Sequence, residues 1–301
     1  MVEAAADAGS EAPGARPESL IQVLRAAEDY LAARGVDAPR RSAELLMGRV
    51  LGLTKLELYL SHDRPVSEDE RAALRAWIYD RGRGVPVAHL LGDWDFFGLE
   101  LDVTSDVLVP RPETEHLVEL AIELAPPNAR CVDLGTGSGA IAVALAVNRP
   151  DVTVTATELE ASAAAVARQN VERHGLADRV QVVEGRTWEP VAEQPPFDLL
   201  VSNPPYVDPA RPDLIAAEVA EFEPASALYT ESGDPCSVYA EILAGVARHV
   251  RPGGPVLFET GVGAAEAALE LMRRAASVEQ VELRDDLAGL PRYLISRARE
   301  S

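Results

Sequence analysis

Apolar residues recur at helical spacing in the first part of the chain. The first predicted helix starts at Ser19, and its apolar face consists of Leu20, Val23, Leu24, Ala27, Tyr30 and Leu31. A second helix is predicted from Arg40 to Leu51, and a third begins at Ser67 with capping-box spacing. Together these helices predict a small all-α domain over residues 18–85.

The pattern changes after Gly84. Apolar and polar residues alternate around Gly98, which predicts a β-hairpin within a linker over residues 86–110. Pro110, Pro112 and Thr114 then mark the start of a helix that runs to about Ala125.

From Arg130 strands and helices alternate. The predicted strands are Cys131–Leu134, Thr153–Thr157, Val180–Val183, Asp198–Ser202 and Val256–Glu259, and the predicted helices are 140–148, 161–174, 236–250 and 263–276. Such alternation predicts an α/β domain over residues 111–301, with a doubly wound, Rossmann-like, mostly parallel sheet. Val278–Leu283 and Tyr293–Ser296 flank a short turn, so one strand in the edge region is expected to be antiparallel.

Composition narrows the class of protein. Hydrophobic residues make up 47% of the chain and charged residues 26%, which is typical of a globular protein. The sequence shows no apolar run long enough to span a membrane and no signal peptide at its start, so we expect a cytoplasmic enzyme without a membrane partner. Residues 1–17 are expected to be a disordered tail. Cys131 and Cys236 have no metal-ligand spacing, and no metal is expected.

The net charge of −21 is unevenly distributed. Residues 1–85 carry 14 acids and 12 bases, whereas residues 86–301 carry 35 acids and 16 bases, a net of −19. Acidity aids solubility, but it also opposes binding to phosphates, which depends on Lys and Arg. The charge therefore weighs against a long nucleic-acid ligand.

A glycine-rich stretch, Asp133–Gly139, follows an apolar strand and opens a helix. Glycine lets the backbone turn tightly and approach a ligand, because no Cβ intervenes. Glu158 ends the next strand, where a carboxylate can accept hydrogen bonds from the hydroxyls of a ribose. Arg186, Thr187 and Trp188 stand at the end of the third strand, a position that usually faces the adenine in sheets of this kind. These features fit NAD as well as an adenosyl ligand.

The fourth strand of the series leads into Asn203-Pro204-Pro205-Tyr206. The prolines stiffen the loop and leave carbonyl groups free, Asn203 adds a side-chain acceptor, and Tyr206 adds a flat face. Such a fork can accept hydrogen bonds from an –NH₂ group and orient its lone pair toward a methyl sulfonium. The loop alone also fits a stiff turn, but its place after a glycine-loop sheet favours methyl transfer to an amide or amine nitrogen.

These residues resemble the protein glutamine-N5 methyltransferases that modify peptide-chain release factors (the PrmC/HemK type). The resemblance covers residues 18–297 and also rests on the stretches Phe97-Gly98, Val109–Glu115, Glu223-Pro224 with Ala227-Leu228, and Asp286–Gly289. Asn-Pro-Pro-Tyr is shared with adenine-N6 DNA methyltransferases, whereas Pro-Arg-Pro-Glu-Thr-Glu and Asp-Leu-Ala-Gly are not. In this family an Asp usually stands at the position of Arg186.

The resemblance implies S-adenosylmethionine as cofactor and the glutamine of a Gly-Gly-Gln motif in a release factor as substrate. The implied cofactor-binding residues are Gly135, Thr136, Gly137, Ser138, Gly139, Glu158, Arg186, Thr187 and Asn203. The implied catalytic residues are Asn203, Pro204, Pro205 and Tyr206, and the helical domain is expected to contact the release factor.

Two other readings stay open from the residues alone. An amino-methyltransferase acting on adenine or guanine in DNA or rRNA would present the same fork to a flipped base. An NAD-binding or non-catalytic doubly wound protein would explain the glycine loop, but it leaves Asn203–Tyr206 without a role.

Overall fold

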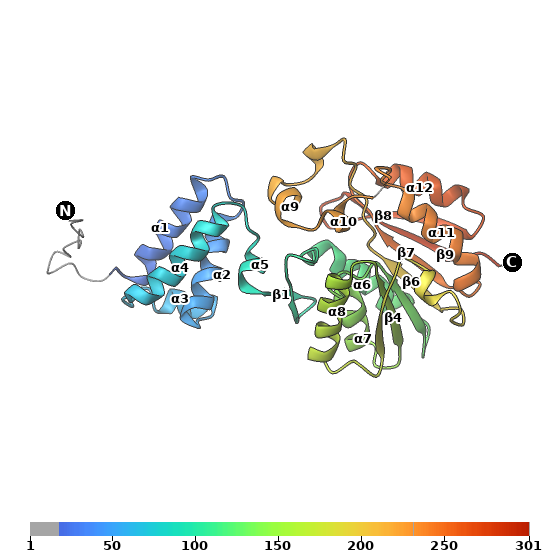
Figure 1. Cartoon of the computed structure of the whole chain (residues 1–301), viewed down its shortest axis with the longest axis horizontal. Helices are drawn as coiled ribbons and strands as arrows, with labels where there is room; N and C mark the ends of the chain where they lie inside the picture. The colour runs from blue at the N-terminus through green and yellow to red at the C-terminus, as the bar shows by residue number, and fades with distance from the viewer. Residues whose placement is uncertain (1–17, 231, 301) are drawn as a thin grey trace, which may run out of the picture. The chain divides into compact units, whose positions relative to one another are not determined.

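A computed structural model of the chain describes residues 18–230 and 232–300 (Figure 1). The tail predicted at residues 1–17 lies outside the described residues. The chain divides after Val87 into two compact units, which we call the helical unit and the sheet unit.

The helical unit contains the three predicted helices and a fourth, shorter one. Its elements are α1 (Leu20–Ala32), α2 (Pro39–Leu51), α3 (Lys55–Leu60) and α4 (Glu68–Arg81). The short helix α3, which was not predicted, begins with a capping box between Thr54 and Glu57 and buries Leu58. The three predicted helices are thus confirmed, and the bundle they form includes α3 as well.

The sheet unit is built on seven strands. These are β3 (Arg130–Leu134), β4 (Thr153–Glu158), β5 (Val180–Glu184), β6 (Leu199–Ser202), β7 (Pro255–Glu259), β8 (Val278–Asp285) and β9 (Pro291–Ala298). Their order is β5-β4-β3-β6-β7-β9-β8, and the first five are parallel. Only β9 runs antiparallel to both of its neighbours, one position in from the edge strand β8. The doubly wound sheet with a reversed strand in its edge region is confirmed.

Helices cover both faces of this sheet (Figure 1). One face packs against α6 (Pro112–Leu124), α7 (Ala140–Asn148) and α8 (Ala161–Arg173), and the other against α11 (Ser237–His249) and α12 (Ala265–Arg274). Central strands of a parallel sheet are buried on both faces and so read as continuous apolar runs. Accordingly, every residue of β6 and β7 is buried.

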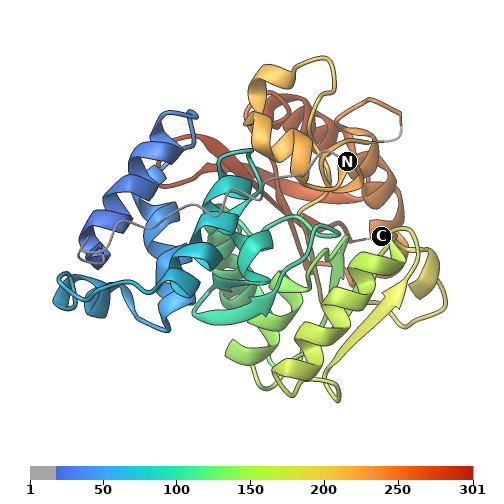
Figure 2. The same ribbon diagram turned by 60° about the vertical axis from the view of Figure 1, so that its left-hand side comes forward.

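A small hairpin precedes the sheet unit's first long helix. It consists of β1 (Asp93–Phe96) and β2 (Leu99–Asp102), joined by Phe97 and Gly98, both with positive φ, as a tight hairpin turn requires. The hairpin follows the short helix α5 (Val87–Leu91). It lies beside α8 (Figure 2), where the Asn170 side chain bonds the backbone N–H and carbonyl of Asp102. The predicted hairpin is confirmed.

The strand order reverses between β3 and β6. From β3 the chain proceeds to β4 and β5 on one side, then returns to β6 and β7 on the other. In such sheets the crevice at the carboxyl ends of the strands beside this switch point is where ligands bind.

The chain between β6 and α11 lies over the same end of the sheet. It contains two short 3-10 and α-helical turns, η2 (Pro212–Leu214) and α9 (Ala217–Phe222), followed by α10 (Ala225–Leu228). Another single 3-10 turn, η1 (Glu189–Val191), precedes β6. Among the described residues, none of the helices combines the length and the apolar content needed to cross a membrane.

Candidate active site

The glycine loop connects β3 to α7. Gly135, Gly137 and Gly139 all have positive φ, between 57° and 81°, which favours glycine at each position. A Cβ added to Gly135 or Gly137 would meet no protein atom within 4 Å, so at both positions the backbone faces open space. At Gly139 it would lie 3.3 Å from Ala167 of α8, so this glycine allows the close packing of two helices.

Hydrogen bonds to β4 and to its own strand, β3, hold the glycine loop in place. The backbone N–H groups of Gly135 and Thr136 donate to the carbonyl of Thr157, at 2.9 and 3.0 Å. The Thr136 hydroxyl donates to the carboxyl of Asp133, at 2.5 Å. Asp133 is fully buried, and burial raises its pKa to about 7. These contacts fix the loop with its outer face toward a cavity.

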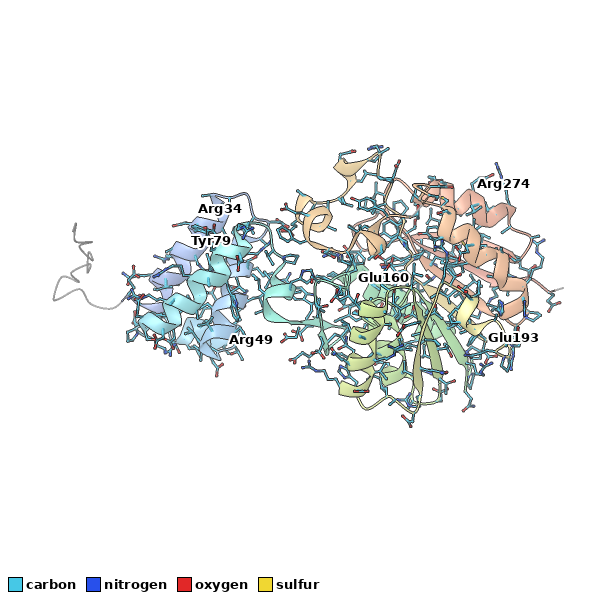
Figure 3. All side chains as sticks on the ribbon, in the orientation of Figure 1. Arg34, Arg49, Tyr79, Glu160, Glu193 and Arg274 are labelled. Carbon is cyan, nitrogen blue, oxygen red and sulfur yellow. The ribbon has the colours of Figure 1, made fainter. Side chains whose placement is uncertain are left out.

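Glu158 ends β4 beside this loop. Its carboxylate accepts hydrogen bonds from the backbone N–H of Gly137, at 2.8 Å, and from that of Glu160, at 3.0 Å. Glu160, labelled in Figure 3, follows β4 at the same end of the sheet. Burial raises the pKa of Glu158, and the two backbone bonds oppose that rise. The carboxylate is therefore held rigidly at the rim of the cavity.

The three residues considered for an adenine contact, Arg186, Thr187 and Trp188, follow β5 and face two different surroundings. The guanidinium of Arg186 donates to Glu241 of α11, and the Thr187 hydroxyl donates to the same carboxylate at 2.6 Å. Trp188 turns into the core, where its indole N–H donates to the carbonyl of Ile242 at 2.8 Å. Of the three residues considered for an adenine contact, Arg186 and Thr187 line the cavity.

Asn203 and Pro204 lie on the wall between two cavities. The first cavity is lined by Gly135–Ser138, Glu158, Arg186 and Thr187, and the second by Tyr206, Glu259, Gly261, Val262 and Arg292. Both are lined by Leu108, Arg111, Asn203, Pro204 and Ala227. The loop after β6 therefore borders both the cavity that contains the glycine loop and the second cavity.

Pro205 lines the first cavity and Tyr206 the second. Just before them, the buried Ser202 hydroxyl donates to the carbonyl of Leu134 at 2.6 Å, which ties the end of β6 to the end of β3. The loop is thereby anchored at the switch point of the sheet.

The Tyr206 ring is closely packed. A Cβ added to Gly261 would lie 2.5 Å from Cε2 of that ring, so only a glycine fits there without displacing it. Arg292 lies at the Tyr206 hydroxyl. Burial raises the pKa of Tyr206 well above its usual value, and the Arg292 charge opposes that rise. The hydroxyl therefore stays neutral at physiological pH.

The structure also brings residues to the site that the sequence reading left unassigned. Thr114 lines the first cavity and Glu259 the second, and both lie beside Asn203, with Thr114 donating to the Glu259 carboxylate at 2.7 Å. Glu223 is buried and holds Arg111, which lines both cavities, through a contact of 2.5 Å. A signal for Glu259 was present, because an acid at the end of a buried strand is unusual.

Among the residues that the structure describes, no three His, Cys, Asp or Glu side chains are grouped so that they could hold a metal ion. The polar groups of the site are instead backbone amides, carbonyls and side chains suited to an organic ligand.

Two known domain families match the chain, one over most of the helical unit and the other over much of the sheet unit. Residues 22–92 match the PrmC N-terminal domain, and residues 96–255 match the methyltransferase small domain. A methyltransferase from Pyrococcus furiosus has a similar fold, with a TM-score of 0.50 and 21% sequence identity over 68% of this chain and 91% of that one. The sheet unit is thus a methyltransferase domain of the doubly wound type.

Full-length relatives identify the family. The release factor glutamine methyltransferase of Geobacter sulfurreducens is 40% identical, over 86% of this chain and 90% of the relative. That of Bordetella pertussis is 43% identical, over 88% of this chain and 96% of the relative. The chain belongs to the release factor glutamine methyltransferase family.

The first cavity fits the cofactor that such an enzyme needs. Gly135 and Gly137 leave backbone exposed where any Cβ would project into the cavity, and Glu158 presents a fixed carboxylate at its rim. Backbone close to the ligand and a strand-end acid are the features that bind an adenosyl group's ribose. The residue-by-residue assignment of the cofactor contacts stays a prediction.

Proposed function

We propose that this protein transfers a methyl group from S-adenosylmethionine to the side-chain amide nitrogen of a glutamine in a peptide-chain release factor. The observation that carries the proposal is the position of Asn203 and Pro204 on the wall shared by the two cavities. A methyl donor in the first cavity and an amide in the second would meet at this wall.

On the donor side, Gly135–Ser138, Glu158, Arg186 and Thr187 would hold S-adenosylmethionine. Its sulfonium supplies a methyl carbon that is already activated toward a nucleophile. Glu158 would accept hydrogen bonds from the ribose, and the Arg186–Glu241 pair with Thr187 would border the adenine. Asn203 would contribute from the opposite wall.

On the acceptor side, the Asn203 side-chain carbonyl and the Pro204 backbone carbonyl would each accept one N–H of the glutamine amide. Two acceptors direct the nitrogen lone pair toward the methyl carbon and stabilise the positive charge that develops on nitrogen. In the transfer, the amide nitrogen held by these acceptors would bond to the methyl carbon, and the electron pair of the broken carbon–sulfur bond would go to sulfur. One N–H proton then passes to solvent.

Pro205 and Tyr206 would pack around the planar amide. The helical domain, residues 18–85, would contact the release factor, and the protein would act in the cytoplasm, where its substrate is used. The sheet unit's acidic surface supports a protein substrate, because it lacks the excess of basic residues with which proteins grip nucleic acid.

The experiment that tests this function offers three substrates in parallel. Purified protein is incubated with methyl-labelled S-adenosylmethionine and either a release factor, double-stranded DNA or ribosomal RNA. We expect label on the release factor alone, and label on nucleic acid alone would contradict the proposal. A thermal-shift comparison of S-adenosylhomocysteine with NAD separates a methyltransferase from a nucleotide-binding protein, because only a bound ligand stabilises the fold.

A further inference from the structure

Beside Asn203, the first residue of the loop after β6, lies a buried pair of polar side chains from two distant parts of the chain. Thr114 is on the first turn of α6 and Glu259 is the last residue of β7. Ser202 of β6 pairs with Phe258 of β7, so Asn203, which follows β6, lies beside Glu259 at the end of β7. Both Thr114 and Glu259 are buried, at 5% and 1% exposure.

Three hydrogen-bonding groups meet there. The Thr114 hydroxyl donates to the Glu259 carboxylate at 2.7 Å, and the Asn203 side-chain NH₂ donates to the Thr114 oxygen at 3.4 Å. The same NH₂ group also faces the Glu259 carboxylate.

The chemistry of these groups fixes the direction of each bond. An ionised carboxylate can only accept, so both the threonine hydroxyl and the asparagine NH₂ must donate toward it. A hydroxyl that donates to Glu259 has only lone pairs left for Asn203. The NH₂ of Asn203 is therefore held on the side of Thr114 and Glu259, and its carbonyl oxygen points away from them.

We propose that Thr114 and Glu259 are positioning residues that hold the Asn203 amide in the one orientation that offers its oxygen to the substrate. This inference rests on the proposed function and specifies how its acceptor fork is maintained. A flipped Asn203 would turn two N–H donors toward the donor –NH₂ group of the glutamine, so the substrate would lose an acceptor and meet a repulsive contact.

The surroundings of Glu259 make this a device that responds to pH. Burial raises the pKa of Glu259 to about 7, while the Thr114 hydroxyl and the Arg292 charge oppose the rise and the Glu113 carboxylate adds to it. The other titratable groups facing it are the phenols of Tyr206, Tyr239 and Tyr293. A protonated Glu259 could donate to Thr114, and the direction of the bonds would no longer be imposed.

The test compares three variants with the wild type. Thr114→Val removes the hydroxyl at nearly constant volume, and Thr114→Ser keeps it. Thr155→Val is the matched control, because it makes the same change at a buried threonine in β4. For each protein the kcat for methylation of a release factor, the affinity for S-adenosylhomocysteine and the melting temperature are measured.

We expect Thr114→Val to lower kcat roughly tenfold or more, with cofactor affinity close to that of the wild type. Thr114→Ser should retain most of kcat. A Thr114→Val enzyme with the kcat of the Thr155→Val control would overturn the inference. So would a Thr114→Ser enzyme as slow as Thr114→Val, or an equal loss of cofactor affinity.

A pH profile provides a readout that a purely structural role would not change. In the wild type, kcat should rise as pH increases through the pKa of Glu259, and Glu259→Gln should lose this inflection. An identical inflection in Glu259→Gln would also overturn the inference. A wild-type enzyme that labels no release factor at all would instead contradict the proposed function, so the two failures are distinguishable.

Discussion

The close contact between Gly261 and Tyr206 gives a quantitative prediction for Gly261→Ala. The new Cβ would lie 2.5 Å from Cε2, 3.1 Å from Cδ2 and 3.2 Å from Cζ of the Tyr206 ring. Gly261 is not among the glycines with positive φ, so the alanine backbone itself fits. The whole cost therefore comes from displacing the ring.

Overpacking of this kind costs about 1–3 kcal/mol. For a unit of roughly 200 residues, a loss of about 2 kcal/mol lowers the melting temperature by roughly 4–8 °C. Because Gly261 and Tyr206 both line the second cavity, the kcat/KM for the release factor should fall while the affinity for S-adenosylhomocysteine stays near the wild-type value.

A double-mutant cycle isolates the contact. In a Tyr206→Ala background the ring is absent, so adding Gly261→Ala should cost almost no further stability. Both single variants and the double variant are compared by chemical denaturation and by calorimetric titration with S-adenosylhomocysteine. An equal loss from Gly261→Ala in both backgrounds would refute the reasoning, as would a loss of cofactor affinity in place of turnover.

Four further predictions follow from the same geometry. Asn203→Ala should reduce turnover by at least about 100-fold and leave much of the cofactor affinity; a near-wild-type rate in a methylation assay would contradict its role. Gly137→Val places a branched side chain in the first cavity and strains a backbone with φ of 57°, so calorimetry should detect no S-adenosylhomocysteine binding. Glu223→Gln weakens the bond to Arg111, whose side chain is about one third exposed; it should cost about 1–2 kcal/mol in denaturant unfolding, and an unchanged midpoint would contradict this. Burial raises the pKa of Glu259 to about 7, so the folded state binds its proton more tightly than the unfolded state does. Its contribution to stability therefore falls as pH rises from about 4.5 to 7, and Glu259→Gln should reduce the difference in melting temperature between pH 5.5 and pH 8.

Much of the fold was predictable from local pattern. The spacing of apolar residues in the strands and in the helices between them can be seen directly in the sequence. The hairpin around Gly98 is indicated by its turn residues. Helix α3 was not predicted because it has only six residues and buries only Leu58. A helix of this length is too short to show a clear hydrophobic period. Its capping box at Thr54 and Glu57 was visible, and it was the available signal.

The parts of the site that are formed by a single continuous segment could be predicted from the sequence. The glycine loop and Asn203–Tyr206 each follow a strand, and the doubly wound topology brings strand ends together. The contact of Thr114 with Glu259 joins residues 145 positions apart, and it depends on how α6 packs on β7. No local pattern encodes such a contact, so only the folded chain shows that Thr114 and Glu259 meet.

Arg186 illustrates a departure that the structure explains. The sequence places a base where the family usually has an acid, and the fold supplies a carboxylate from elsewhere, Glu241 of α11, bonded to both Arg186 and Thr187. An ion pair therefore borders this end of the first cavity. The separation of these residues in the chain hid the pairing from a sequence reading.

The most direct test of the central claim is the position of the transferred methyl group. A release factor is incubated with the protein and S-adenosylmethionine, digested, and mapped by tandem mass spectrometry, with Asn203→Ala enzyme as the control. We expect one added methyl on the side chain of the glutamine in the Gly-Gly-Gln motif, with none from the control. A methyl group on any other residue, or an unmodified glutamine after complete turnover of the cofactor, would contradict it.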